Sequence, residues 1–386
     1  MRKKIIWGVF IAAFFAFLIL FNGSLDYPSP GDIQTGNMYE KAVVTRVMSD
    51  TLAPDPDFPE IKIGVQELEF RILTGEQRGK LFLANNFVGR LDNKPANAGT
   101  KMIVSSYDGF VSGTVVDYSR EDVLYALALA FVAALALFGG MKGLKAFMAL
   151  AFTLICVIFL FVPMLLKGVE PILAAVVIVT LSTAVTMLAL NGFSRKTVAA
   201  TGGCMICTFL AGGLALAAGW FAHVSTYTTA EAEHLIFIAQ STRLSLHDIL
   251  FSGIIIASSG AVMDTSISIA SSMHELRELD PAMPSGALLR SGLNIGRDIM
   301  GTMANTLILA FTGSGINTIL VVFMYQMPYL RIINISGLAV EILRGLSGSI
   351  GLVLSIPVTA ALAVRLMPPE AQRNDLPAKC KERKIT

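Results

Sequence analysis

One carboxylic acid stands inside a long apolar segment of the sequence, where an ionisable side chain is costly. Asp264 lies within the run 248–270, and ionisable residues inside a membrane span commonly mark an ion or substrate path. Small residues share its helical face at spacings of three and four: Gly253, Ala257, Gly260, Ala261 and Ser268. We expect this face to point into a helix bundle. The alternative is an acid satisfied by neighbouring hydroxyls purely for packing.

A polar stripe is expected on the next apolar helix. Asp298, Thr302 and Asn305 fall on one side of it at helical spacing. From the rise of an α-helix, Asp264 and Asn305 both lie on the cytoplasmic side of their spans, at depths that allow them to meet. Asp298, beside Arg297, is nearer the membrane boundary, where a charge at the start of a helix is the simpler interpretation. We expect Asp264, Asp298, Thr302 and Asn305 to line an ion or substrate path.

A second pair of charges precedes the last apolar segment. Glu341 and Arg344 stand three residues apart, which suits an ion pair within one helix. The run 329–366 is too long for one span, so the part before Gly345 is expected to be interfacial or re-entrant, with the glycines from Gly345 to Gly351 as a flexible or close-packed joint. Broken helices often line transporter paths, which makes Glu341 and Arg344 secondary site candidates.

Residues that could hold a metal or a cofactor form no recognised motif. The outer histidines, His223, His234 and His247, lie 11 and 13 residues apart, which matches no compact ligand spacing. Cys204 and Cys207 spell C-x-x-C, but inside an apolar segment rather than beside a βαβ unit. The G-x-x-x-x-G-K-[ST] phosphate-binding motif is absent. We expect no metal, no cofactor and no enzymatic activity.

The composition places these residues in a membrane protein. Of 386 residues, 54% are hydrophobic and 15% are charged, against roughly 25% charged in soluble domains, and the mean hydropathy is +0.65. Several apolar runs reach the length that spans a bilayer. The formal net charge of +2 gives no strong single-sign field, which argues against nucleic acid as a partner. A soluble globular protein is excluded, and the lipid bilayer is the expected partner.

Apolar runs bounded by charge, glycine or proline predict a mainly α-helical polytopic protein with about eight transmembrane helices. They lie at 5–21, 123–140, 145–166, 171–191, 197–221, 248–270, 299–325 and 343–366. Lysine and arginine accumulate in alternate connections, which are then cytoplasmic by the positive-inside rule. Because the number of helices is even, both termini are expected in the cytoplasm.

Four parts follow one another along the chain. Residues 1–23 are expected to be an uncleaved anchor helix, since no Ala-x-Ala pattern follows the apolar run. Residues 24–122 show short alternating segments between turns, which predicts a small extracytoplasmic β domain, a compact barrel of the OB or SH3-like kind. Asp55, Asp57 and Glu60 lie among prolines, which is more typical of a stiff solvated loop than of a cation site. Residues 123–366 would form a seven-helix membrane domain, and 367–386 a cytoplasmic tail.

Three stretches carry a family resemblance. They are Gly260-Ala261-Val262-Met263-Asp264, then Gly296-Arg297-Asp298-Ile299-Met300-Gly301-Thr302-Met303-Ala304-Asn305-Thr306-Leu307, and then Gly348-Ser349-Ile350-Gly351 with Pro357. The chain resembles the YibE/F family of bacterial multipass membrane proteins over nearly its whole length, and the anchor with its β domain makes it similar to the longer, YibE-like form. The resemblance implies a location in the bacterial cytoplasmic membrane, but no substrate, activity or site residues.

The sequence leads to two functional hypotheses. In the first, the protein is a secondary transporter or a transporter subunit, in which Asp264 carries a proton or cation while Thr302 and Asn305 help line the path. In the second, it is a membrane-anchored interaction or scaffold protein whose outer β domain binds a partner. A homo-oligomer or a paired membrane subunit is compatible with both.

Overall fold

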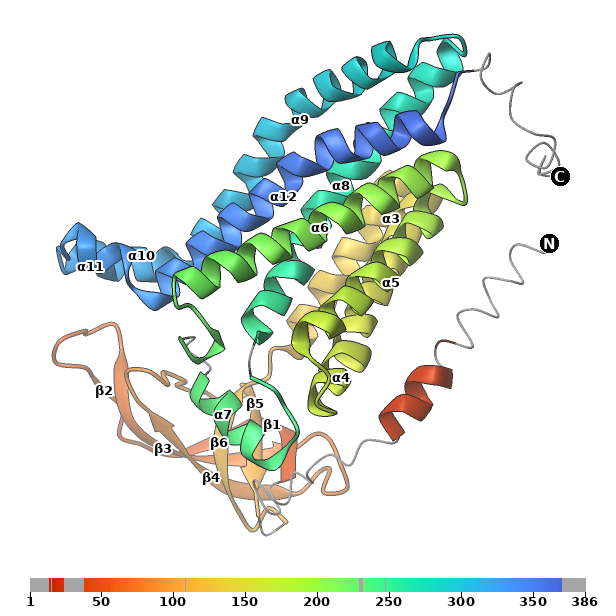
Figure 1. The fold of residues 1–386 in the computed structure, drawn as a ribbon. Coiled ribbons are helices and arrows are strands. Elements are labelled where there is room, and N and C mark those ends of the chain that lie inside the picture. The colour runs from red at the N-terminus through yellow and green to blue at the C-terminus, as the bar shows by residue number, and fades with distance from the viewer. Residues whose placement is uncertain are drawn as a thin grey trace. The chain divides into compact units, whose positions relative to one another are not determined.

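The chain divides into two compact units, which are described separately. The first is Asp26–Ala134, and the second combines Met1–Leu25 with Leu135–Thr386. The first holds the strands and the beginning of the first long helix, and the second holds the other helices (Figure 1). The computed structural model describes residues 14, 16–23, 38–107, 109–228, 232–246 and 248–369, and 66% of the chain is helical.

The strands of the first unit form a barrel. They are β1 (Met38–Asp50), β2 (Ala53–Pro54), β3 (Lys62–Ile72), β4 (Leu81–Val88), β5 (Lys101–Ser106) and β6 (Ser112–Tyr118). Strands β1, β5, β6, β4 and β3 are neighbours in that order, and β3 pairs again with β1, which closes the ring. All these pairs are antiparallel except β4 with β6. This connectivity is that of the OB kind of barrel, so the structure decides between the two kinds that the sequence left open.

Alternating side chains build the core of the barrel. Along β4, exposed and buried residues alternate over the whole strand. The rings of Phe70 and Phe82 stack with their centroids 5.6 Å apart, and Phe110 meets Phe82 edge-on at 5.1 Å. Aromatic side chains bury the largest apolar areas, so these three rings carry much of the barrel's hydrophobic stabilisation.

The proline-rich loop between β1 and β3 is anchored by an ion pair between the buried carboxylate of Asp55 and the half-exposed Arg90. Asp55 is 1% exposed and accepts a 2.9 Å hydrogen bond from Arg90 Nη2, together with the backbone N–H groups of Asp57 and Phe58. The guanidinium of Arg90 lowers the pKa of Asp55, although burial of the carboxyl opposes that effect. The expectation of a solvated loop is therefore wrong at Asp55, because a distant arginine supplies its counter-charge.

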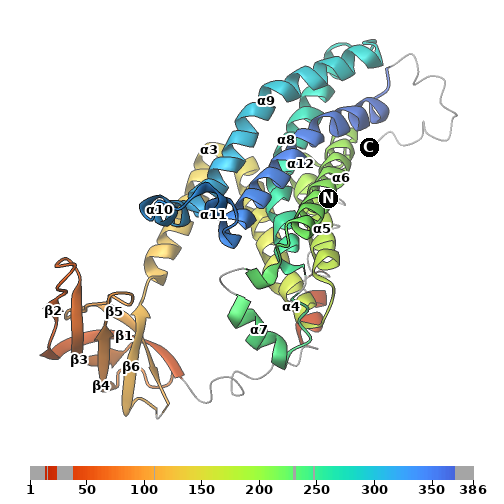
Figure 2. The same ribbon diagram turned by 60° about the vertical axis from the view of Figure 1, so that its left-hand side comes forward.

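The barrel is tied to the first turn of α3 (Glu121–Cys156) by ion pairs. Lys41 Nζ lies 2.7 Å from Glu121 and 3.0 Å from Asp122, and Lys101 Nζ lies 2.7 Å from Asp122. Strand β6 also runs almost directly into this helix (Figure 2). Beyond the first turn, α3 is apolar and exposed on nearly every side as far as Phe138.

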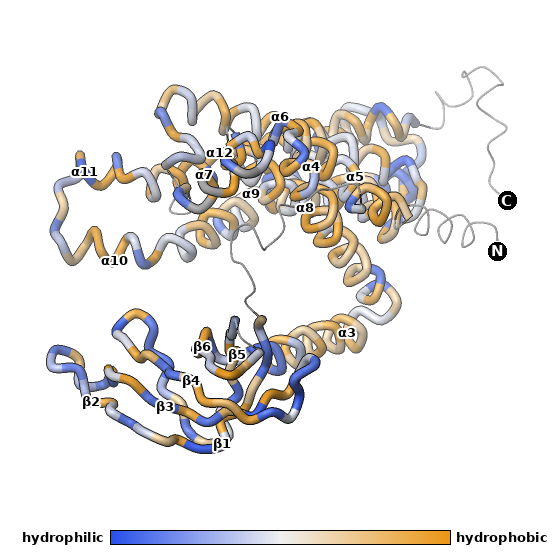
Figure 3. The backbone as a smooth tube through the Cα atoms, turned by 90° about the horizontal axis from the view of Figure 1, so that it is seen from below, coloured by the Kyte–Doolittle hydropathy of each residue, from blue (hydrophilic) through white to orange (hydrophobic). Residues whose placement is uncertain are grey.

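The second unit is a bundle of helices. Its elements are η1 (Val157–Phe161), α4 (Val162–Leu166), α5 (Pro171–Asn191), α6 (Arg195–Phe221), η2 (Thr226–Thr228), α7 (Ala232–Ser241), α8 (Ile249–Leu279), α9 (Ser285–Ser314), α10 (Ile316–Met324), α11 (Tyr329–Ile333) and α12 (Ser336–Leu366). Five helices of the described chain are long and apolar enough to cross a membrane, or six if α9 and α10 count as one bent span. Apolar residues run along these helices (Figure 3). The predicted spans 171–191, 197–221, 248–270 and 343–366 correspond to α5, α6, α8 and α12.

Two predicted spans, 123–140 and 145–166, are joined in the structure. One helical stretch of 46 residues, Glu121–Leu166, is interrupted at Gly140, whose φ of 53° and ψ of −137° are not helical. If straight, it would be about 69 Å long, more than twice the roughly 30 Å apolar core of a bilayer. The break therefore separates two segments of membrane length. Most of the predicted span 5–21 and of the tail after 366 lies outside the described residues.

The helix break expected before Gly345 lies elsewhere. α12 runs without interruption, whereas the predicted span 299–325 is broken at Gly315, where α9 and α10 differ in direction by 62°. Of the flexible and the close-packed joint that the sequence left open for the glycines of α12, the structure shows close packing. A Cβ on Gly351 would lie 2.5 Å from the Cβ of Ala211 on α6, so the missing side chain lets the two helices approach closely.

Candidate functional site

Helix α8 is held in the bundle by one face that carries hydroxyl groups. Ser266 Oγ lies 3.2 Å from Thr359 Oγ1 on α12, and Cys204 Sγ on α6 lies 3.8 Å from the carbonyl of Ser259. Thr265 donates to a carbonyl of its own helix, as membrane serines and threonines often do. The sequence analysis did not predict this contact surface between α8 and helices α6 and α12, although the hydroxyl residues fall at helical spacing on the side of α8 opposite Asp264.

Asp264 lies on the outside of the bundle and not within it. Its side chain is exposed, as is the small-residue face that shares its side of α8: Gly253, Ala257, Gly260 and Ser268. A Cβ on Gly253 or Gly260 would meet nothing within 4 Å. The expectation that this face points into the bundle is therefore wrong, because the opposite face, with Val262 fully buried, already meets α6 and α12.

The polar stripe predicted on α9 is also exposed. Asp298, Thr302 and Asn305 all lie on the surface, and Thr302 Oγ1 donates to the carbonyl of Ile299 at 2.9 Å. The buried side of α9 carries Gly296, which packs against a side chain of α12. Nine residues further on, Asn305 points about 180° away from Gly296.

The two polar stripes belong to neighbouring helices and lie at matching levels. Gly292 of α9 packs against Met273 of α8. Further along, Leu307 of α9 and Ser258 of α8 both lie next to Gly348 of α12, so these two residues are at the same level. This antiparallel register places Asp264 level with the residues around Thr302, within about one helical turn of Asn305. No hydrogen bond or ion pair joins these side chains in the described part of the chain. We call this surface, formed by Gly253, Ala257, Gly260, Asp264 and Ser268 of α8 and by Asp298, Thr302 and Asn305 of α9, the open face.

Glu341 and Arg344 form the ion pair that their spacing predicts, and they lie at the helix break. Arg344 Nη1 is 3.0 Å from Glu341 Oε1, and Ser314, the last residue of α9, donates to Glu341 Oε2 at 3.3 Å. The guanidinium of Arg344 stands 6.0 Å from the centre of the Phe311 ring. A cavity of about 170 Å³ adjoins the pair and is lined by Thr312, Gly315, Leu338 and several other apolar side chains.

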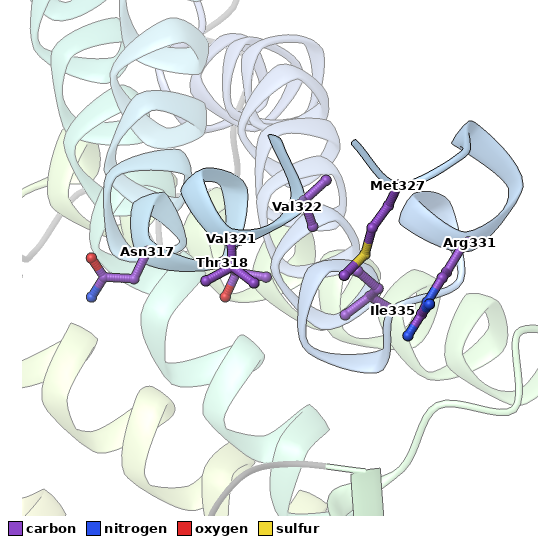
Figure 4. Close-up of a pocket in the computed structure, with 7 residues that line it drawn as sticks. All are labelled: Asn317, Thr318, Val321, Val322, Met327, Arg331 and Ile335. Atoms are coloured by element: carbon purple, nitrogen blue, oxygen red, sulfur yellow. The ribbon is translucent and has the colours of Figure 1, made fainter. Parts of the chain in front are cut away.

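A second hollow lies where α10, α11 and the start of α12 meet. It measures about 450 Å³ and is wide open. Arg331 is its one charged lining residue, beside Asn317, Thr318, Val321, Val322, Met327 and Ile335 (Figure 4). No sequence pattern pointed to this hollow, because three separate elements form it.

Arg277, which the sequence marks only as a cytoplasmic charge, is buried. Its Nε donates to the carbonyl of Met367 at 3.1 Å, and its Nη1 donates to the carbonyl of Met283 at 2.6 Å. It thereby fastens the end of α8 to the start of α9 and to the end of α12. This arginine positions the two helices of the open face.

Metal ligands do not gather in the described residues. No group of three or more His, Cys, Asp or Glu side chains there has the geometry of a metal site. Cys204 and Cys207 are both fully buried, on the seam between helices α6, α8 and α12. The absence of a metal or cofactor requirement stays a prediction.

The family of the chain follows from a comparison with family models. The model described as YibE/F-like protein matches residues 127–369, which is more than half of the chain and contains the open face and the helix break. The chain belongs to the YibE/F-like family. The match covers the helical part and leaves the barrel outside it. No curated protein and no solved structure matches this YibE/F-like protein.

Family and apolar helices together indicate that this YibE/F-like protein is a membrane protein. In that setting the open face is unusual, since carboxylate and amide groups inside a bilayer almost always face protein or a water-filled cavity. Chemically, the open face offers the carboxylate of Asp264, the hydroxyl of Thr302 and the amide of Asn305 at neighbouring levels. Such a set can bind and release a proton or a small cation.

Proposed function

We propose that this YibE/F-like protein is a multipass protein of the bacterial cytoplasmic membrane and acts as a secondary transporter or a transporter subunit, with Asp264 as its ion-coupling group. The observation that carries the proposal is the position of Asp264 on the open face of a 31-residue apolar helix. An acid at such a position costs free energy in lipid, and acids inside membrane spans often mark ion paths and proton relays. Asp298, Thr302 and Asn305 extend the polar surface along α9.

The break at Gly315 supports the same proposal. Discontinuous helices expose backbone carbonyl groups at their ends, and transporters use such ends to bind ions and substrates. Here the end of α9 adjoins the pair of Glu341 and Arg344 and a cavity of about 170 Å³. We assign this region to the same path as a secondary site. No enzymatic activity is expected.

Proton uptake into vesicles tests the proposal. Purified full-length protein is reconstituted with a pH-sensitive dye inside, and a potassium diffusion potential drives uptake. We expect Asp264→Asn to reduce uptake at least about tenfold, because an amide cannot carry the proton. Glu275→Gln is the matched control, since Glu275 is an exposed acid on the same helix beyond its apolar part. Equal uptake by wild type and Asp264→Asn would contradict the assignment.

A scaffold role remains the second candidate, and one surface favours it. Leu81, Leu83 and Phe87 project from the outer side of β4, and Val65 lies opposite Phe87 on β3. Contiguous exposed apolar side chains on a soluble domain often mark a protein interface. If the barrel's partner binding is the function, Leu83→Lys abolishes capture of that partner, whereas Asp264→Asn leaves it unchanged.

A further inference from the structure

The open face is incomplete in a single chain. Asp264 and Asn305 lie at neighbouring levels of two apolar helices, and the described residues provide neither with a hydrogen-bond partner. Lipid tails can satisfy neither group, because they hold no donor or acceptor. Within the helical unit, the other sides of α8 and α9 already pack against α6 and α12. Another protein surface is needed to cover the open face.

We propose that a second copy of this chain covers the open face, in a two-fold dimer formed by α8 and α9 of both copies. The proposal rests on the membrane insertion in the proposed function, but not on transport. Two copies share one orientation in the bilayer, so their two-fold axis lies along the membrane normal. Each residue of the interface then meets its own counterpart, or a neighbour at the same depth.

The open face is complementary to itself under that symmetry. Gly253, Ala257 and Gly260 have no neighbour at their Cβ side, so two α8 helices can approach closely. Asn305 carries both donors and an acceptor, so its amide can hydrogen-bond with a polar side chain of the other copy at the same depth. Arg297 and Asp298 are adjacent and exposed, so each can pair across the axis with the opposite charge of the other copy.

The dimer would also complete the coupling site. Two Asp264 carboxyl groups, one from each copy, lie at the same depth beside the axis. Two carboxylates in contact cannot both stay ionised unless a proton or a cation lies between them. A single exposed acid in the monomer would thus become a pair that binds one cation at the interface.

Disulfide cross-linking in native membranes tests the interface. The full-length variant Ala257→Cys is oxidised, and the yield of covalent dimer is measured on non-reducing gels. Ala217→Cys is the matched control, because Ala217 is also an exposed alanine but lies on α6. The wild-type chain, which has only the native cysteines, gives the background yield of covalent dimer. We expect at least about ten times more dimer from Ala257→Cys than from Ala217→Cys.

A second pair of variants tests the close approach itself. In the Ala257→Cys chain, Gly260→Leu should lower the dimer yield about tenfold by wedging the helices apart, and Gly213→Leu on α6 should not. Both glycines are exposed and have nothing within 4 Å of a Cβ, so we expect each leucine to point away from the single chain. Equal yields from the two leucine variants, a cross-link within one chain, or one to a different protein would overturn the proposal. Proton uptake is a separate readout, so an intact dimer together with equal uptake by wild type and Asp264→Asn would count against the transport assignment alone.

Discussion

At the scale of single residues, the pair of Asp55 and Arg90 makes the stability of the barrel depend on pH. Because Arg90 lowers the pKa of Asp55, the carboxylate stabilises the folded barrel above the unfolded pKa of about 3.9. This contribution is lost as the pH falls through the lower pKa of the folded state. We expect hydrogen-exchange protection of β1 and β3, corrected for intrinsic rates, to fall below about pH 4.

Two carboxyl variants separate this effect from general acid denaturation. Asp55→Asn should be less stable at pH 7 and should lose this component of the pH dependence. Asp92→Asn should keep it, since Asp92 is an exposed acid in the same domain, with its nearest cation 3.5 Å away. The same acid response in wild type and Asp55→Asn would refute the assignment.

Glu341 and Arg344 are expected to depend on each other more than surface ion pairs do. Their side chains are only 24% and 28% exposed, so removing one leaves the other charge poorly solvated. A double-mutant cycle with Glu341→Gln and Arg344→Gln, measured by reversible unfolding in detergent, should give a coupling of about 1–2 kcal/mol. The exposed pair Asp117 and Arg120 is the control and should give less than about 0.5 kcal/mol. Similar couplings for both pairs would mean that the helix break is well hydrated.

At the scale of elements, the bend in the first long helix depends on one glycine. Gly140 has φ of 53° and ψ of −137°, a conformation that costs other residues about 1–3 kcal/mol. Gly139 beside it has no such φ, and neither position has an atom within 4 Å of a Cβ. We therefore expect Gly140→Ala to lower the free energy of unfolding by that amount and Gly139→Ala to leave it unchanged or raise it. Thermal unfolding in detergent measures both, and a stable Gly140→Ala protein would mean that the bend lies elsewhere.

At the scale of the whole molecule, charge distribution predicts which ends of the helices face the cytoplasm. The arginines at the end of α8 and in the first half of α9, Arg277, Arg290 and Arg297, predict that the turn between these helices is inside and the barrel outside. A membrane-impermeant maleimide applied to spheroplasts should label Asp92→Cys in the barrel directly. It should label Gly286→Cys, an exposed glycine at the start of α9, only after permeabilisation. The reverse labelling pattern would mean that the protein has the opposite orientation in the membrane.

The sequence by itself determined the class of the protein and most of its elements. Apolar length and glycine or proline boundaries located α5, α6, α8 and α12 because a bilayer requires runs of that length whatever their neighbours. Alternation of period two located β3 for a similar local reason. The pair of Glu341 and Arg344 was also predictable, since residues three apart on a helix are neighbours.

Only the tertiary structure decided which helix faces are covered. Spacing places Asp264 and the small residues of α8 on one face, but not whether that face meets protein, because close packing depends on the shapes of α6 and α12. Gly351 was expected in a flexible or close-packed joint and makes a close contact with α6, whereas the helix breaks at Gly315, for which the sequence led to no prediction. The counter-charge of Asp55 lies 35 residues away in the sequence, and the closure of the barrel in OB order depends on pairings between strands that are also far apart in the sequence. Such long-range contacts are set by the whole fold, which local sequence patterns do not encode.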